Sequence, residues 1–170
     1  MKVGDSIEDF DFEAYHAGKF IRGNTEDFRG KWLVLFFYPR DFTFVCPTEL
    51  RGFAKMIGGF EEENAVVLAC STDSLHSHKA WFESDLKEVA YPVIADTNHS
   101  ITQMFDILLQ NGEALRGTFI FNPDGILKYQ VVSDNNVGRS TDETLRVLKA
   151  LKTGGLCPLD WQPGQPTLSK

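Results

Sequence analysis

The chain has 170 residues, with 17 basic and 24 acidic side chains, so its formal net charge is −7. This length and a hydrophobic content of 42% fit one ordinary globular domain and exclude a disordered chain. The acidic balance disfavours binding to nucleic acid or to an anionic membrane, because both need clustered lysine and arginine. The longest apolar stretch, Trp32–Tyr38, is too short to span a bilayer, and the acidic first residues lack a signal-peptide pattern. We therefore expect a soluble, cytoplasmic protein.

The chain alternates between strand-like and helix-like segments. Loose alternation from Phe10 to Ile21 predicts a short hairpin, and the apolar run Lys31–Tyr38 predicts a central strand. We then expect, in order, a helix over residues 47–64, a strand over 65–71, a helix over 74–86 capped by Ser74, a short strand over 91–95, a short helix over 100–105, a hairpin over 118–132 with an Asp-Gly turn, and a helix over 141–152. This order predicts an α/β domain over residues 1–152 with a mixed sheet flanked by helices, a layout that resembles the thioredoxin fold. Residues 153–170 are expected to form a tail, because glycine and proline recur there.

Three cysteines, Cys46, Cys70 and Cys157, carry the chemistry that must be explained. No two of them form a Cys-x-x-Cys pair, and none has zinc-ligand spacing with a histidine. Cys70 ends the apolar run over residues 65–70, so a packing role is predicted. Cys157 lies in the expected tail, where an accessible thiol is either incidental or a redox partner. His76 and His78 are interpreted as surface or capping residues rather than as metal ligands or bases.

Cys46 lies at the predicted junction between a strand and a helix. Pro47 suits the first helical position, so the thiol faces the positive end of the helix dipole, which favours the thiolate. Full ionisation of an ordinary thiol at neutral pH increases the nucleophilic form by only about 30-fold. A fast enzyme would therefore also have to position its substrate and stabilise the leaving oxygen.

Two segments carry a family resemblance. Residues 39–49, Pro-Arg-Asp-Phe-Thr-Phe-Val-Cys-Pro-Thr-Glu, resemble the Pro-x-x-x-Thr-x-x-Cys signature of the peroxiredoxins. The tail segment Cys157-Pro-Leu-Asp-Trp161 resembles the resolving-cysteine segment of the typical two-cysteine subgroup. Between them, Leu115-Arg116-Gly and Val137-Gly-Arg139 match in order, so the resemblance covers nearly the whole chain.

The resemblance implies a thiol-dependent peroxidase of antioxidant defence. Cys46 would be the peroxidatic cysteine, which attacks hydrogen peroxide or an organic hydroperoxide and becomes a sulfenic acid. Cys157 of the partner subunit would resolve this acid to a disulfide, in a homodimer that assembles into a ring such as a decamer. A dithiol reductant would reopen the disulfide: thioredoxin, an AhpF-like flavoprotein reductase or an AhpD-like protein. No flavin, haem or metal cofactor is implied.

The resemblance also assigns roles to side chains around Cys46. Thr43 would place its hydroxyl beside the thiolate and donate to a peroxide oxygen. Arg116 would supply a fixed positive charge near the thiolate and the developing anionic oxygen. Pro39 would shield the site from water, Glu49 would orient an arginine, and Arg139 is a weaker candidate further from the sulfur.

Two departures from the family pattern carry expectations of their own. The Gly-Gly-Leu-Gly insertion of members sensitive to over-oxidation is missing, and the chain stops at Lys170, so we expect over-oxidation to need a large excess of peroxide. The helix after Cys46 contains Gly52, Gly58 and Gly59, which either weaken it so that its first turn unwinds or allow close helix packing.

Two other functions remain as alternatives. An oligomeric holdase chaperone would expose large apolar patches. A thiol–disulfide oxidoreductase is disfavoured, because Cys-x-x-Cys is absent.

Overall fold

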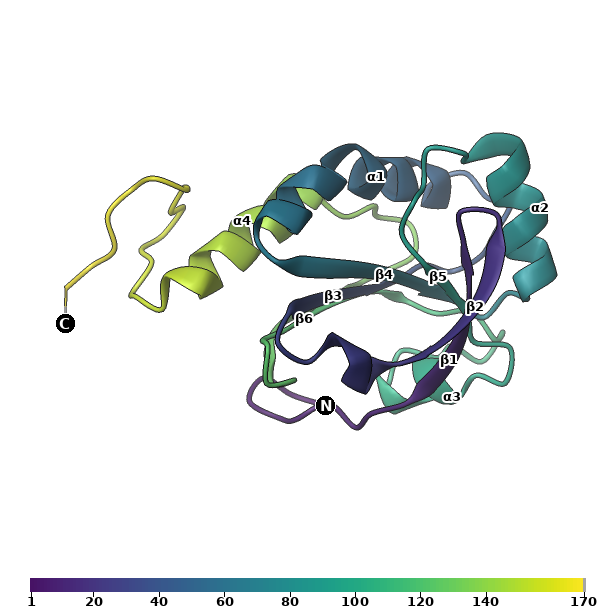
Figure 1. Cartoon of the computed structure of the whole chain (residues 1–170), viewed down its shortest axis with the longest axis horizontal. Helices are drawn as coiled ribbons and strands as arrows, with labels where there is room; N and C mark the ends of the chain where they lie inside the picture. The colour runs from purple at the N-terminus through teal and green to yellow at the C-terminus, as the bar shows by residue number, and fades with distance from the viewer. Residues whose placement is uncertain (170) are drawn as a thin grey trace.

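A mixed sheet of seven strands forms the centre of the structure, a computed structural model that describes residues 1–169 (Figure 1). Lys170, the last residue of the expected tail, lies outside the described residues. The strands are β1 (Asp11–His16), β2 (Lys19–Asn24), β3 (Trp32–Phe37), β4 (Ala65–Ser71), β5 (Val93–Ala95), β6 (Arg116–Phe121) and β7 (Leu127–Ser133). Their order across the sheet is β2-β1-β5-β4-β3-β6-β7. The β3–β4 and β4–β5 pairs are parallel and the other pairs are antiparallel, which confirms the predicted mixed α/β architecture.

Three helices and one 3₁₀ turn connect the strands, and a fourth helix follows the last strand. They are η1 (Thr25–Phe28), α1 (Cys46–Glu62), α2 (Leu75–Asp85), α3 (Ser100–Met104) and α4 (Thr141–Thr153). Every predicted strand and helix is present, and the Ser74 hydroxyl caps α2 by accepting from the backbone N–H of Ser77. The turn η1 was not predicted; a capping box between Asn24 and Asp27 stabilises it.

The sheet separates two hydrophobic cores. Along β3 the side chains alternate: Val34 and Phe36 pack with α1, α2 and α4 on one face, whereas Leu33, Leu35 and Phe37 pack on the other face. Figure 1 shows α1, α2 and α4 on one side of the sheet and α3 with the N-terminal residues on the other. The strand that leads to Cys46 is thus buried on both faces, as its continuous apolar run predicted.

The three glycines of α1 have different surroundings. A Cβ added at Gly52 would lie 2.7 Å from Oγ1 of Thr141, and one added at Gly59 would lie 2.9 Å from Cδ2 of Leu145. Both neighbours belong to α4, so these two glycines permit the close approach of α4 to α1. A Cβ added at Gly58 would meet nothing within 4 Å, so packing gives no reason for a glycine there.

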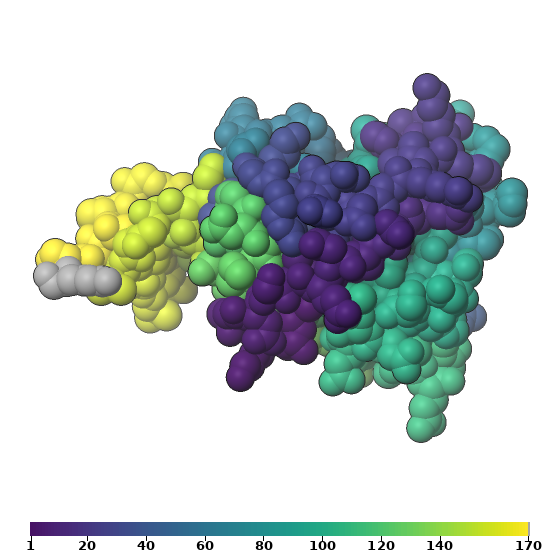
Figure 2. Space-filling view, turned by 60° about the horizontal axis from the view of Figure 1, so that its bottom comes forward, coloured from purple at the N-terminus to yellow at the C-terminus, as the bar shows by residue number. Residues whose placement is uncertain are grey.

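The tail begins where α4 ends, at Gly154 in the left-handed region with a φ of 65°. It folds back on itself through a bridge between Leu156 and Leu168. Trp161 is buried, and its carbonyl accepts a 2.8 Å hydrogen bond from Nη1 of Arg146 on α4. The tail and the end of α4 project from one end of the molecule (Figures 1 and 2). No helix within residues 1–169 is long and apolar enough to cross a membrane.

Candidate active site

Cys46 is the first residue of α1, one position earlier than the sequence pattern predicted. The helix follows a loop over residues 38–45 that leaves the carboxyl end of β3. Pro47 occupies the next helical position, where the missing N–H of proline costs no hydrogen bond. The side chain of Cys46 lies against the positive end of the helix, and the residue is only 1% exposed.

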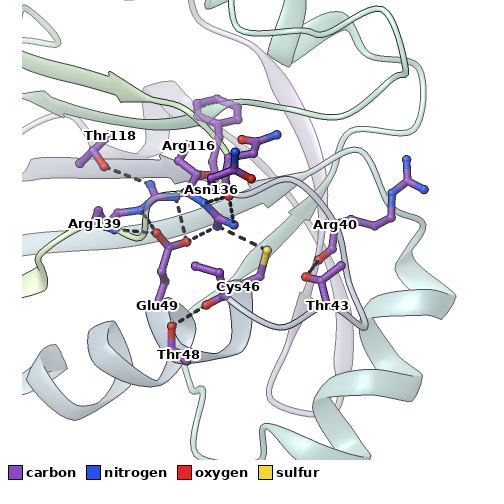
Figure 3. A network of polar contacts seen from close by, with 12 residues as sticks. Arg40, Thr43, Cys46, Thr48, Glu49, Arg116, Thr118, Asn136 and Arg139 are labelled. Atoms are coloured by element: carbon purple, nitrogen blue, oxygen red, sulfur yellow. Dashed lines mark hydrogen bonds and ion pairs between the residues drawn. The ribbon is translucent and has the colours of Figure 1, made fainter.

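Arg116, the first residue of β6, points its guanidinium at Cys46 (Figure 3). Its Nη1 lies 3.4 Å from the sulfur and donates a 2.7 Å hydrogen bond to Oε2 of Glu49. Its Nε and Nη2 both donate to the backbone carbonyl of Asn135, at 3.1 and 2.9 Å. Because every edge of the guanidinium is engaged and the side chain is buried, the positive charge is fixed in place beside the sulfur.

Glu49, on the first turn of α1, joins Arg116 to a second buried arginine. Its Oε1 accepts from the backbone N–H and from Nε of Arg139, both at 2.9 Å. Arg139 also donates to the carbonyls of Gly117 and Phe37, and burial lowers the pKa of its guanidinium although the Glu49 carboxylate opposes this. Two cations and one carboxylate leave one uncompensated positive charge in this buried network. This charge lies beside the sulfur of Cys46.

Thr43 and Pro39 lie in the loop that precedes Cys46. The Thr43 hydroxyl donates a 2.8 Å hydrogen bond to the carbonyl of Arg40, as Figure 3 shows, so in this state its hydrogen is directed away from the sulfur. Its oxygen keeps lone pairs free to accept from a bound hydroxyl. Pro39 is buried two residues after β3 and offers no N–H to a ligand or a water molecule.

The other two cysteines lie apart from this network. Cys70 is buried in β4, where burial and the nearby Asp96 carboxylate raise the pKa of its thiol well above the ordinary value, so it stays protonated. Cys157 is partly exposed in the tail, with its sulfur 3.6 Å from the carbonyl of Ala150 and 3.5 Å from Oγ1 of Thr153. Within residues 1–169 no three His, Cys, Asp or Glu side chains are placed to hold a metal ion.

The interpretation of His78 as a surface or capping residue was wrong, whereas His76 is exposed and packs edge-on against Phe20. His78 is fully buried and lies 2.7 Å from a carboxylate oxygen of Asp41. Its helical spacing to Trp81 and Phe82, three and four residues later and both buried, was the available signal for an inward-facing position. No such signal in the sequence marked Asn135, because the group that binds Arg116 is its backbone carbonyl, which every residue has.

Comparison with known proteins identifies the family of the chain. The model of the AhpC/TSA family matches residues 3–130. YkuU of Bacillus subtilis (strain 168) is 50% identical over 175 residues, which cover 98% of this chain and 97% of YkuU. Peroxiredoxin prdx-2 of Caenorhabditis elegans is 43% identical over 98% of this chain and 88% of its own length.

A solved structure extends the likeness to three dimensions. The reduced 2-Cys peroxiredoxin of Plasmodium vivax superposes with a TM-score of 0.94 at 32% identity, covering 97% of this chain and 91% of that one. This match confirms the thioredoxin-like fold that the order of elements predicted. The chain belongs to the AhpC/TSA family and is a peroxiredoxin, a thiol-dependent oxidoreductase that acts on peroxides in antioxidant defence.

Proposed function

We propose that Cys46 is the peroxidatic thiol and that Arg116 stabilises both its thiolate and the oxygen that leaves. The observation that carries this proposal is the 3.4 Å contact between Nη1 of Arg116 and the Cys46 sulfur at the start of a helix. The thiolate attacks one oxygen of hydrogen peroxide or an organic hydroperoxide, an S–O bond forms and the O–O bond breaks. The departing hydroxide or alkoxide takes up a proton and leaves as water or alcohol, and Cys46 becomes a sulfenic acid.

Four neighbouring residues support this step. Thr43 turns its hydroxyl to the bound peroxide, which requires it to exchange its bond to the Arg40 carbonyl. Pro39 keeps water from the sulfur, since it has no N–H to hold a water molecule. Glu49 and Arg139 hold Arg116 in its orientation through the buried ion pairs.

We further propose that Cys157 of a partner subunit resolves the sulfenic acid. The C-terminal tail leaves the molecule at the end where α1 finishes, whereas Cys46 begins α1 at its other end (Figure 1). Condensation of the Cys157 thiol with the sulfenic acid releases water and forms a disulfide. Because Cys46 is only 1% exposed, its loop and the first turn of α1 must open before the two sulfurs meet.

A homodimer supplies this partner. Strand β7 is a free edge of the sheet, and its Val131 and Val132 are 42% and 43% exposed. An exposed apolar edge strand pairs readily with a second copy. Phe44, 95% exposed beside Cys46, and Leu159, 92% exposed in the tail, offer further apolar contacts for the partner subunit and for a ring of dimers such as a decamer.

A dithiol reductant of thioredoxin, AhpF-like or AhpD-like type then reopens the disulfide by thiol–disulfide exchange. Three free thiols and this dependence on a reductant suit a reducing compartment, which supports a cytoplasmic location.

Trapping of the sulfenic acid tests the nucleophile, and a non-reducing gel tests the partner. After one equivalent of hydrogen peroxide, dimedone should label Cys46 in the Cys157→Ser variant, and mass spectrometry should locate the label. Without dimedone, the wild type should migrate at twice its 19.2 kDa mass on a non-reducing gel. A label on another cysteine would refute the role of Cys46, and an oxidised protein that stays at monomer mass would refute resolution between subunits.

A further inference from the structure

A buried polar cluster joins the loop before Cys46 to helix α2. Asp41 of the loop is 3% exposed and His78 of α2 is 0% exposed, and Oδ2 of Asp41 lies 2.7 Å from Nδ1 of His78. The Ser77 hydroxyl donates to the same oxygen at 2.9 Å. The Tyr38 hydroxyl donates to the other oxygen, Oδ1, at 2.7 Å. Helix α2 thus holds one oxygen of the Asp41 carboxylate, and Tyr38, at the start of the loop, holds the other.

The hydrogen atoms of this cluster follow from its partners. His78 Nε2 lies 3.0 Å from the carbonyl of Ile94, which can only accept, so Nε2 carries a hydrogen. Nδ1 faces Oδ2 of Asp41 at 2.7 Å, so these two atoms form a hydrogen bond. Burial and the Asp41 carboxylate raise the pKa of Tyr38 well above its ordinary value, so its hydroxyl stays protonated and donates.

Departure of the loop would leave these groups unpaired. Without Asp41, the imidazole of His78 and the hydroxyl of Tyr38 would lose their shared acceptor. An unpaired buried polar or charged group is strongly destabilising. The cluster is therefore satisfied only while the loop stays in place.

The loop needs such an anchor because its backbone is strained. Phe42, next to Asp41, has a φ of 56°, in the left-handed region that bulky residues avoid. The Phe42 ring packs against Trp81 of α2, with the ring centres 5.6 Å apart, but the residue remains 58% exposed. The ion pair of Arg40 with Glu113 is partly exposed and so contributes little. The pair of Asp41 with His78, by contrast, is fully buried and ties the loop to α2.

We propose that His78 is a positioning residue that, through Asp41, holds the loop over residues 38–45 in the conformation that reacts with peroxide. The role of His78 in catalysis rests on the proposed function of Cys46. The closed loop carries Pro39 and Thr43 and leads directly into Cys46, whereas disulfide formation with Cys157 needs the loop open. The pair thereby sets the balance between the first oxidation and its resolution.

Two substitutions at one position separate this role from general support of the fold. In His78→Asn the side-chain amide nitrogen lies where Nδ1 lies and can still donate to Asp41. In His78→Gln the amide nitrogen lies where Nε2 lies, so it keeps only the bond to the Ile94 carbonyl. In His78→Gln we expect oxidation of the thiol by hydrogen peroxide to slow several-fold and disulfide formation to speed up about tenfold. In His78→Asn both rates should stay within about threefold of the wild type. Rapid quenching followed by mass spectrometry measures the two rates separately, and urea unfolding compares the stability of the variants.

Hydrogen exchange of the reduced protein, without peroxide, measures loop opening independently of the chemistry. Peptides over residues 38–48 should exchange faster in His78→Gln than in His78→Asn or the wild type. Equal exchange in the two variants, or equal changes of both rates, would overturn the role of His78. A wild type whose Cys46 is not oxidised would instead refute the proposed function, while the exchange result would still decide whether His78 holds the loop.

Discussion

Arg116 and Arg139 share Glu49 as their buried partner, but only Arg116 contacts the sulfur. Replacing each in turn by methionine removes one positive charge and keeps a long apolar side chain. We expect the two variants to rank in opposite order in the two assays: Arg116→Met should lose more activity than Arg139→Met, and Arg139→Met should lose more stability than Arg116→Met.

The magnitudes follow from the contacts that each substitution removes. Loss of a fixed donor at the reacting atoms lowers a rate by about 10²–10³-fold, which is the loss expected for Arg116→Met. Arg139→Met leaves Arg116 in contact with the sulfur but removes a more distant charge, so we expect a loss of about tenfold. Arg139 donates hydrogen bonds to Glu49, Gly117, Thr118 and Phe37. Arg139→Met removes these bonds and breaks a buried ion pair, so the free energy of unfolding should fall by about 3–5 kcal/mol. Arg116→Met should lower the free energy of unfolding by about 1–3 kcal/mol, because besides Glu49 and the sulfur Arg116 binds a single carbonyl, that of Asn135.

Rapid-quench measurement of peroxide loss gives the second-order rate, and urea unfolding gives the stability of the same reduced proteins. The reasoning requires the order of the two variants to reverse between the assays. Rates that fall in proportion to stability, or equal rate losses in both variants, would show that Arg116 acts only by holding the fold.

Three further predictions follow from the structure. Gly58→Ala should stabilise α1 by about 0.5–1 kcal/mol and raise the thermal midpoint by about 1–4 °C. Gly59→Ala should raise the midpoint less, because the added Cβ would meet Leu145 of α4. A larger rise for Gly59→Ala than for Gly58→Ala in calorimetry would contradict the packing of α4 on α1. Cys157→Ser should accumulate sulfinic acid at low peroxide excess, whereas the wild type should form disulfide; mostly sulfinic wild type would show that resolution is slow. Arg146→Met removes the donor to the Trp161 carbonyl and should free the tail, which faster hydrogen exchange over residues 156–168 would reveal and unchanged exchange would refute.

The sequence predicted the elements well because local patterns dominate them. The continuous apolar run before Tyr38 indicated a strand buried on both faces, and Pro47 after a cysteine indicated a helix start. The site depends on residues far apart in the chain: Arg116 reaches Cys46 across 70 residues and Arg139 reaches Glu49 across 90. Only the family motifs pointed to these pairings, since spacing alone does not predict long-range contacts.

The contacts of polar side chains in the loop before Cys46 could not be predicted from the sequence. Nothing in the sequence pattern singled out Asp41, yet its carboxylate faces inward to His78. The orientation of the Thr43 hydroxyl, directed to the Arg40 carbonyl, also depends on the folded loop rather than on the motif. The contact of Asp41 with His78 forms only when α2 packs beside the loop, which no local pattern encodes.

The most direct test of the central claim compares peroxide consumption by single cysteine variants. One equivalent of hydrogen peroxide is mixed with the reduced wild type, with Cys46→Ser and with Cys70→Ser, the matched control in which a buried, protonated thiol is removed. We predict loss of peroxide orders of magnitude faster than with a free thiol in the wild type and in Cys70→Ser, and no such loss in Cys46→Ser. Equally fast consumption by Cys46→Ser would contradict the assignment of Cys46 as the attacking thiol.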